Sequence, residues 1–221
     1  YDKEMILAFE KEVLGIYLSG HPLEKYRNIM EKMISARTID FQPDEESGIP
    51  KVYDGQKVII GGMITEKTIK YTRNNKVMAF LTVEDLMGTV EIVVFPRDYE
   101  KWQSQLNEEA RVFIQGRVNA EDDKPSKLIL EKVRTFEDMP REIWIQFKDR
   151  ADYAQKEAEL LNYLRGVAGT SAVVIYLKDV NAMKRLPAGY HVQISDFMLA
   201  DLRQKYGDSN VKVVERVLKN F

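Results

Sequence analysis

A short stretch of basic and aromatic residues is the part of this sequence whose types and spacing indicate chemistry most clearly. Between Lys67 and Val83 the chain contains four cationic side chains and Tyr71, and it contains no acidic residue. Lysine and arginine neutralise phosphates and release their counterions, and aromatic rings stack on unpaired bases. The stretch therefore predicts contact with a single-stranded nucleic acid through Lys67, Lys70, Tyr71, Arg73 and Lys76.

Two phenylalanines and one arginine are expected to extend this candidate site. Side chains alternate between the two faces of a strand, and the aliphatic face is the one that packs. The odd-numbered positions of residues 77–83 and the even-numbered positions of residues 90–94 are all aliphatic, which turns Phe80 and Phe95 outward. We predict that both rings stack on bases and that Arg117, in a later strand, adds a positive charge.

The same residues have a plainer interpretation. Aromatic rings covered by a neighbouring helix or domain, beside lysines in a solvated loop, would give the same pattern. The formal net charge is −2, so bulk charge cannot hold a polyanion. Binding of a nucleic acid therefore depends on whether this local patch is exposed.

Five segments alternate with a period of two, and one helical segment, opened by Pro96 and expected over residues 97–106, lies between the third and the fourth. This order is that of the five-stranded OB barrel, in which the strand faces and adjoining loops bind single strands. Adjacent glycines, Gly61 and Gly62, indicate a bend or bulge in the first strand. The expected strands cover residues 56–67, 76–84, 89–95, 111–119 and 127–133.

The predicted fold class is an α+β multi-domain chain. Apolar residues at helical spacing predict a helical lead over residues 1–34, whose second helix covers residues 23–34. Proline, glycine and acidic residues make residues 35–54 a linker or an irregular wrap. The OB-fold domain is expected over residues 55–139, and a small α+β domain over residues 140–221.

The α+β domain contains one segment that resembles a known docking peptide. Residues 193–197 are loosely similar to the peptide by which replication proteins bind sliding clamps, but Ser195 is expected to cap a helix instead. We therefore expect a structural role for this segment. The elements expected here are strands over residues 142–147, 171–177, 190–194 and 211–217, and helices over residues 151–164 and 195–206.

The residue types do not indicate a catalytic or metal site. The chain has no cysteine, and its two histidines, His21 and His191, lie about 170 positions apart. Acidic pairs fall in expected turns or in the linker, and no glycine-rich phosphate loop is present. We expect no catalytic residue, metal or cofactor here, and His21 is expected to hold a joint between two helices. The lack of cysteine and of a membrane-spanning apolar run fits a cytoplasmic chain without a membrane segment.

Residues 12–23 make the sequence specific, because they read EVLGIYLSGHPL. They resemble the signature that precedes the OB domain in the alpha subunits of bacterial DNA polymerase III, the C-family replicative polymerases. Residues 77–84, 90–96 and 116–118 are similar to the barrel of the same subunits. The resemblance continues, more weakly, into the C-terminal domain.

The resemblance implies an accessory role, which is to bind single-stranded template near an active site that lies elsewhere. In this family the catalytic aspartates belong to a palm domain, and a PHP domain lies at the N-terminus. Neither is present in these residues, so Mg²⁺ is expected only in the polymerase core of the parent DNA-directed DNA polymerase.

The resemblance also implies replisome partners. The C-terminal domain docks the tau subunit of the clamp loader in some members, so residues 140–221 are expected to bind such a partner. The clamp-binding peptide of the family lies just upstream of the helical lead. We expect Tyr1 to follow a cut inside a longer protein, and the sliding clamp to bind only through that upstream peptide.

Two other functions stay open at this point. A tRNA-binding OB module of a synthetase-like protein would share the strand pattern, although no class II synthetase motif is present. A protein-interaction scaffold without a nucleic-acid role would fit the acidic net charge. Comparison of the affinities for tRNA and for unstructured DNA separates the tRNA-binding module from the polymerase role. Absence of any oligonucleotide shift in NMR at low salt would favour the scaffold.

Overall fold

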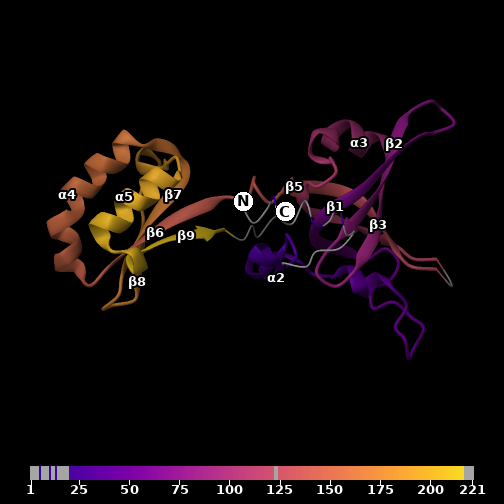
Figure 1. The fold of residues 1–221 in the computed structure, drawn as a ribbon, viewed down its shortest axis with the longest axis horizontal. Helices are drawn as coiled ribbons and strands as arrows, with labels where there is room; N and C mark the ends of the chain where they lie inside the picture. Colours follow the sequence, from indigo (N-terminus) through magenta and orange to yellow (C-terminus); the bar gives the residue numbers. More distant parts are fainter. Residues whose placement is uncertain (1–4, 6–9, 11–12, 14–19, 122–123, 217–221) are drawn as a thin grey trace. The chain divides into compact units, whose positions relative to one another are not determined.

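The computed structural model describes residues 5, 10, 13, 20–121 and 124–216. These residues belong to two compact units, the first containing the chain up to Asp138 and the second spanning Met139–Arg216. Each unit has its own sheet and its own buried core (Figure 1). The first helix expected in the helical lead lies, apart from three positions, outside the described residues.

Five strands close into a barrel in the first unit, which confirms the predicted OB fold and the α+β class. The strand order is β1-β2-β3-β5-β4, with β3 and β5 parallel and the other pairs antiparallel. Alternate side chains fill the barrel, and the aliphatic positions from Ala79 to Val83 and from Val90 to Val94 are buried as expected. The elements are β1 (Lys57–Tyr71), β2 (Val77–Glu84), β3 (Thr89–Val94), α3 (Pro96–Trp102), β4 (Arg111–Asn119) and β5 (Lys127–Thr135).

The glycine pair lies where β1 changes its partner strand. β1 pairs with β4 up to Met63 and with β2 from Met63 onward. A Cβ atom on Gly62 would lie 2.5 Å from the carbonyl oxygen of Glu84, so only glycine allows this close approach. The register irregularity falls between Ile64 and Glu66, and the predicted bulge is therefore present just after the glycines.

Residues 35–54 wrap the barrel and contribute to its core, so they are not a free linker. Phe41 is 0% exposed and packs in the barrel core with Val52. The backbone N–H of Ser35 donates to the carbonyl of Ile59 on β1 at 2.8 Å. A composition rich in turn formers predicted the irregular path. The packing against the barrel was not predicted, because the two apolar residues that anchor the wrap are too far apart in sequence to show a period. Before the wrap, a 3₁₀ turn (Glu24–Tyr26) leads into α2 (Arg27–Met33), and a second 3₁₀ turn covers Thr38–Phe41.

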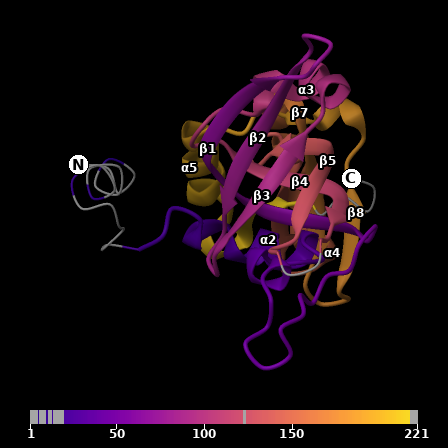
Figure 2. The ribbon, with the colours of Figure 1, turned by 90° about the vertical axis from the view of Figure 1, so that its right-hand side faces the viewer.

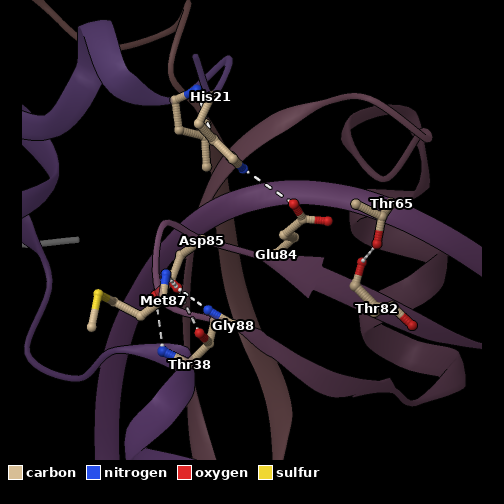
Figure 3. Close-up of polar contacts among 9 residues, drawn as sticks. His21, Thr38, Thr65, Thr82, Glu84, Asp85, Met87 and Gly88 are labelled. Carbon is tan, nitrogen blue, oxygen red and sulfur yellow. Dashed lines mark hydrogen bonds and ion pairs between the residues drawn. The ribbon is translucent and has the colours of Figure 1, made fainter. Parts of the chain in front are cut away.

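A buried carboxylate ties this wrap to the turn between β2 and β3 (Figure 3). Asp85, which is 5% exposed, accepts hydrogen bonds from the backbone N–H and the hydroxyl of Thr38 at 2.9 and 2.6 Å. It also accepts from the backbone N–H groups of Met87 and Gly88 at 2.7 and 3.1 Å. One side chain thus closes the turn and fixes the wrap against it.

His21 contacts both its own loop and the barrel, in the segment before α2. Its Nδ1 accepts from the backbone N–H of Leu23 at 3.1 Å, so the neutral ring carries its proton on Nε2. Nε2 lies 3.1 Å from a carboxylate oxygen of Glu84 on β2, to which it donates (Figure 3). The histidine therefore links the chain before α2 to the barrel.

The second unit is a four-stranded sheet with its helices on one face (Figure 1). The strand order is β8-β7-β6-β9; β6 and β7 are parallel and joined through α4, and the other pairs are antiparallel. Phe147, Leu160, and Leu202 are buried where helices and sheet meet. The elements are β6 (Arg141–Phe147), α4 (Arg150–Gly166), β7 (Ala168–Leu177), β8 (Ala182–Arg185), α5 (Asp196–Tyr206) and β9 (Val211–Glu215).

Two details of this unit differ from the sequence prediction. The strand expected over residues 190–194 is wrong, because the chain there forms a 3₁₀ turn (Ala188–Tyr190) and only isolated bridges through Val192. The fourth strand is instead β8, whose four residues are all exposed. An exposed edge strand has no buried face, so it leaves no alternation in the sequence. Ser195 caps α5 as expected, accepting from the backbone N–H of Met198.

Candidate nucleic-acid interface

The β1–β2 hairpin extends beyond the closed barrel and carries most of the candidate residues. Pairing continues through Lys70↔Met78 to Tyr71↔Val77, whereas β3 ends opposite Ala79. The residues expected to form a loop after position 67 are thus largely strand. A tight turn follows, in which the N–H of Thr72 donates to the carbonyl of Lys76 at 2.8 Å. Figure 2 shows this hairpin end beside α3.

One side of the hairpin continues the outer surface of β2 and β3, and we call Lys70, Met78, Phe80, Val93 and Phe95 the sheet face. Phe80 pairs with Thr68 and Val93, which places these side chains on one surface. Phe95 is 45% exposed and follows β3 directly. The Nζ of Lys70 lies 4.9 Å from the centroid of the Phe80 ring. The structure therefore brings together one cation and both predicted stacking rings.

The other side of the hairpin faces α3. Strand alternation places Lys67 and Tyr71 opposite to Lys70, and the Nζ of Lys67 lies 5.4 Å from the ring centroid of Tyr99 on α3. Tyr71 is exposed. The basic stretch, continuous in sequence, is thus divided between two surfaces by the period of the strand.

The tip of the hairpin carries the remaining two cations of the stretch. Arg73 and Lys76 are exposed. Among residues 20–121 and 124–216, no carboxylate forms an ion pair with Lys70, Arg73 or Lys76. Cations without a carboxylate partner are the ones free to meet phosphates.

Arg117 lies apart from this group. It pairs across the strands with Lys57, the first residue of β1, whereas Lys70 is near the opposite end of that strand. Its guanidinium lies 3.5 Å from one carboxylate oxygen of Glu131, and the other oxygen lies 3.4 Å from the Nζ of Lys57. The structure therefore does not bring Arg117 to the hairpin. Sequence reasoning placed it on a strand, but which strand ends meet is decided by barrel closure.

Two acidic residues lie on the outer surface beyond the sheet face, on the side away from the hairpin tip. The sequence prediction did not include them. Glu66 accepts a hydrogen bond from the hydroxyl of Thr82 at 3.1 Å, and Glu91 forms an ion pair with Lys127 at 2.6 Å. These carboxylates lie on the same outer surface as Phe80, by the register of β1, β2 and β3. The surface suited to a polyanion is therefore the hairpin end of the sheet face.

No cluster of side chains suited to hold a metal ion occurs in the part of the chain that the structure describes. The pair Glu84 and Asp85 is occupied by the contacts to His21 and Thr38 given above. Among the same residues, no helix has the length and apolar character needed to cross a membrane.

Comparison with known proteins places the chain in a family context. Residues 58–136 match the model of an OB-fold nucleic acid binding domain. The DNA polymerase III subunit alpha of Bacillus subtilis (strain 168) is 29% identical over 216 residues, which covers 93% of this chain and 18% of that subunit. Over almost its whole length this chain is similar to the DNA polymerase III alpha subunits. The subunit of Escherichia coli (strain K12) is 26% identical over 226 residues, covering 96% of this chain and 18% of the subunit.

The chain spans about a fifth of the length of these relatives. Among solved structures, a mitochondrial single-stranded DNA binding protein of S. cerevisiae, Rim1, is similar with a TM-score of 0.32 and 16% identity, covering 38% of this chain and 97% of that protein. Of the family signature at residues 12–23, the structure describes residue 13 and the last four residues, Gly20 to Leu23. Within it His21 contacts Glu84, and Leu23 is buried.

Proposed function

We propose that this chain binds single-stranded DNA template for a replicative polymerase related to the DNA polymerase III alpha subunits, without supplying catalytic residues. The observation that carries the proposal is the sheet face, where Phe80 and Phe95 lie with Lys70 beside two tip cations without carboxylate partners. Rings of this kind stack on unpaired bases, and the cations meet the backbone that links them.

The proposal does not require a bound ion or cofactor. Glu66 and Glu91, which share the outer surface with Phe80, are both engaged with protein groups. Mg²⁺ would belong to the catalytic carboxylates of the polymerase core, in a cytoplasmic replisome. Binding of oligonucleotide is therefore expected to persist in EDTA.

The salt dependence of binding tests the number of phosphate contacts. With about four contacts, the slope of log K against log salt concentration is expected to be about −3 for single-stranded DNA. The triple variant Lys70→Ala/Arg73→Ala/Lys76→Ala is expected to reduce the slope to about −1, because one contact remains. Fluorescence anisotropy of a labelled oligonucleotide at several salt concentrations measures both slopes.

A matched control removes the same charge elsewhere. Lys148, Lys178 and Lys212 are exposed residues of the second unit, and their triple alanine variant is expected to keep the wild-type slope. Equal slopes for the hairpin variant and the wild type would remove the hairpin from the site. Affinity for tRNA greater than for an unstructured DNA of equal length would favour the tRNA-binding alternative.

We further propose that the second unit, within residues 140–221, binds a protein partner of the replisome. Supporting this, its sheet has helices on one face, and on the other Trp144 lies beside Tyr176 with 6.3 Å between ring centroids. The tau clamp-loader subunit is the partner that the family resemblance implies, and the sliding clamp is expected to need the parent's upstream peptide. A biosensor measurement with tau and with the clamp tests this, and binding of the clamp alone would contradict it.

A further inference from the structure

A groove lies between the protruding hairpin and α3, on the opposite side of β2 from the sheet face. It encloses about 560 Å³, which is within the range of about 300–1,000 Å³ typical of small-molecule sites. Figures 1 and 2 show α3 beside the hairpin at this point. The described lining residues are Lys76, Val77, Pro96, Arg97, Tyr99, Glu100 and Gln103.

The lining combines apolar walls with two available cations. Tyr99 is half-buried against the barrel core, and the ammonium of Lys67 lies 5.4 Å from its ring centroid. Lys76 and Arg97 are exposed, and neither forms an ion pair within the described ranges 20–121 and 124–216. Glu100 is the one carboxylate among the described lining residues. An aromatic wall beside two free cations suits a base with its phosphate.

The groove and the sheet face meet at the start of β2. Met78 belongs to the sheet face, and Val77, on the opposite side of the same strand, lines the groove. β3 ends at Val94 opposite Ala79, so no third strand separates the two surfaces there. On the other chain segment, Phe95 of the sheet face is followed directly by Pro96 of the groove. A nucleic-acid strand bound on the sheet face can therefore pass over the first residues of β2 into the groove.

We propose that this groove holds a further unpaired nucleotide of the strand that lies on the sheet face. Its base contacts Tyr99 and Val77, and its phosphate lies between Lys76 and Arg97, away from Glu100. The inference rests on the proposed single-strand binding and adds Arg97 and Tyr99 to the site. It also defines the path of the bound nucleic acid over the barrel, which runs between the sheet face and α3.

Oligonucleotides of two lengths test the groove separately from the sheet face. OB folds occupy about 4–16 nucleotides, so thymidine oligomers of about 4 and about 12 nucleotides compare the sheet face alone with both surfaces. Arg97→Glu is expected to weaken binding of the longer oligomer about tenfold and to lower its salt slope by about 1. It leaves the shorter oligomer unchanged. Glu100→Gln is expected to strengthen binding of the longer oligomer.

Lys101→Glu is the matched control, because Lys101 is exposed on the same helix and does not line the groove. It makes the same change of charge and is expected to affect both lengths little. Equal losses of affinity for Arg97→Glu and Lys101→Glu would contradict the proposed nucleotide site in the groove. A loss of affinity for both oligomers in Arg97→Glu would contradict it as well. If sheet-face variants weaken binding and Arg97→Glu does not, the groove is not a nucleotide site and the proposed single-strand binding stands. If the wild type binds neither oligomer, the groove site and the proposed function are both wrong.

Discussion

The double variant Lys70→Ala/Phe80→Ala is expected to bind a short thymidine oligomer about 10–100-fold more weakly than the wild type. Stacking of one base on an aromatic ring contributes about 1–3 kcal/mol, and each 1.4 kcal/mol is a factor of ten in affinity. Lys70 adds a phosphate contact and holds its ammonium 4.9 Å from the same ring. Fluorescence anisotropy at low salt, with the full chain, measures the loss.

Two further variants separate binding from folding. Phe80→Leu keeps an apolar side chain of similar size on the half-buried position but removes the flat ring, so it is expected to lose the stacking contribution alone. Arg117→Ala removes a cation that lies beside Glu131 and far along β1 from the hairpin, and it is expected to leave affinity for the short oligomer unchanged. Wild-type affinity in Phe80→Leu would show that the ring does not stack.

Asp85→Ala is expected to lower the free energy of unfolding of the barrel unit by about 3–4 kcal/mol. The carboxylate accepts four hydrogen bonds, two of them from Thr38. Without it, the buried N–H and hydroxyl of Thr38 lose their partner while water remains excluded, since Thr38 is fully buried. The same change releases the wrap from the turn after β2.

Urea unfolding measures this effect if the signal comes from the barrel alone. The chain has two tryptophans, Trp102 in the barrel unit and Trp144 in the second unit. In a Trp144→Phe background the fluorescence of Trp102 therefore reports barrel unfolding. Asp54→Ala is the matched control, because that exposed carboxylate accepts a backbone hydrogen bond from Ala120 at 3.0 Å, and it is expected to cost less than about 1 kcal/mol. A loss for Asp85→Ala no greater than for this control would contradict the proposed clamp.

Some errors of the sequence prediction have a common cause. The first strand was expected to end at residue 67, but β1 continues to Tyr71. Thr68–Tyr71 pair with β2 alone, and because they have no buried face they leave no strong apolar pattern. β8 has no buried residue. Apolar periodicity detects an element through the face that it buries, and elements that bury nothing escape it.

The sequence by itself determined the barrel, the inward faces of β2 and β3, and the outward position of Phe80 and Phe95. These features follow from the order of the elements and from a two-residue alternation within each barrel strand. It also indicated which residue types could meet a phosphate or a base. Local pattern was sufficient for the positions of the strands and for the direction of their side chains, because neither depends on which segments meet. The barrel was inferred from the order of the elements.

Only the tertiary structure decided how the basic and aromatic stretch is divided. Hairpin pairing places Lys70 with Phe80 and Lys67 beside Tyr99 of α3, while barrel closure takes Arg117 to the far end of β1. Closure also brings Glu66 and Glu91 onto the surface that carries the rings. These are pairings between residues distant in the chain, and they are set by the register of strands around a closed barrel, which no local period contains.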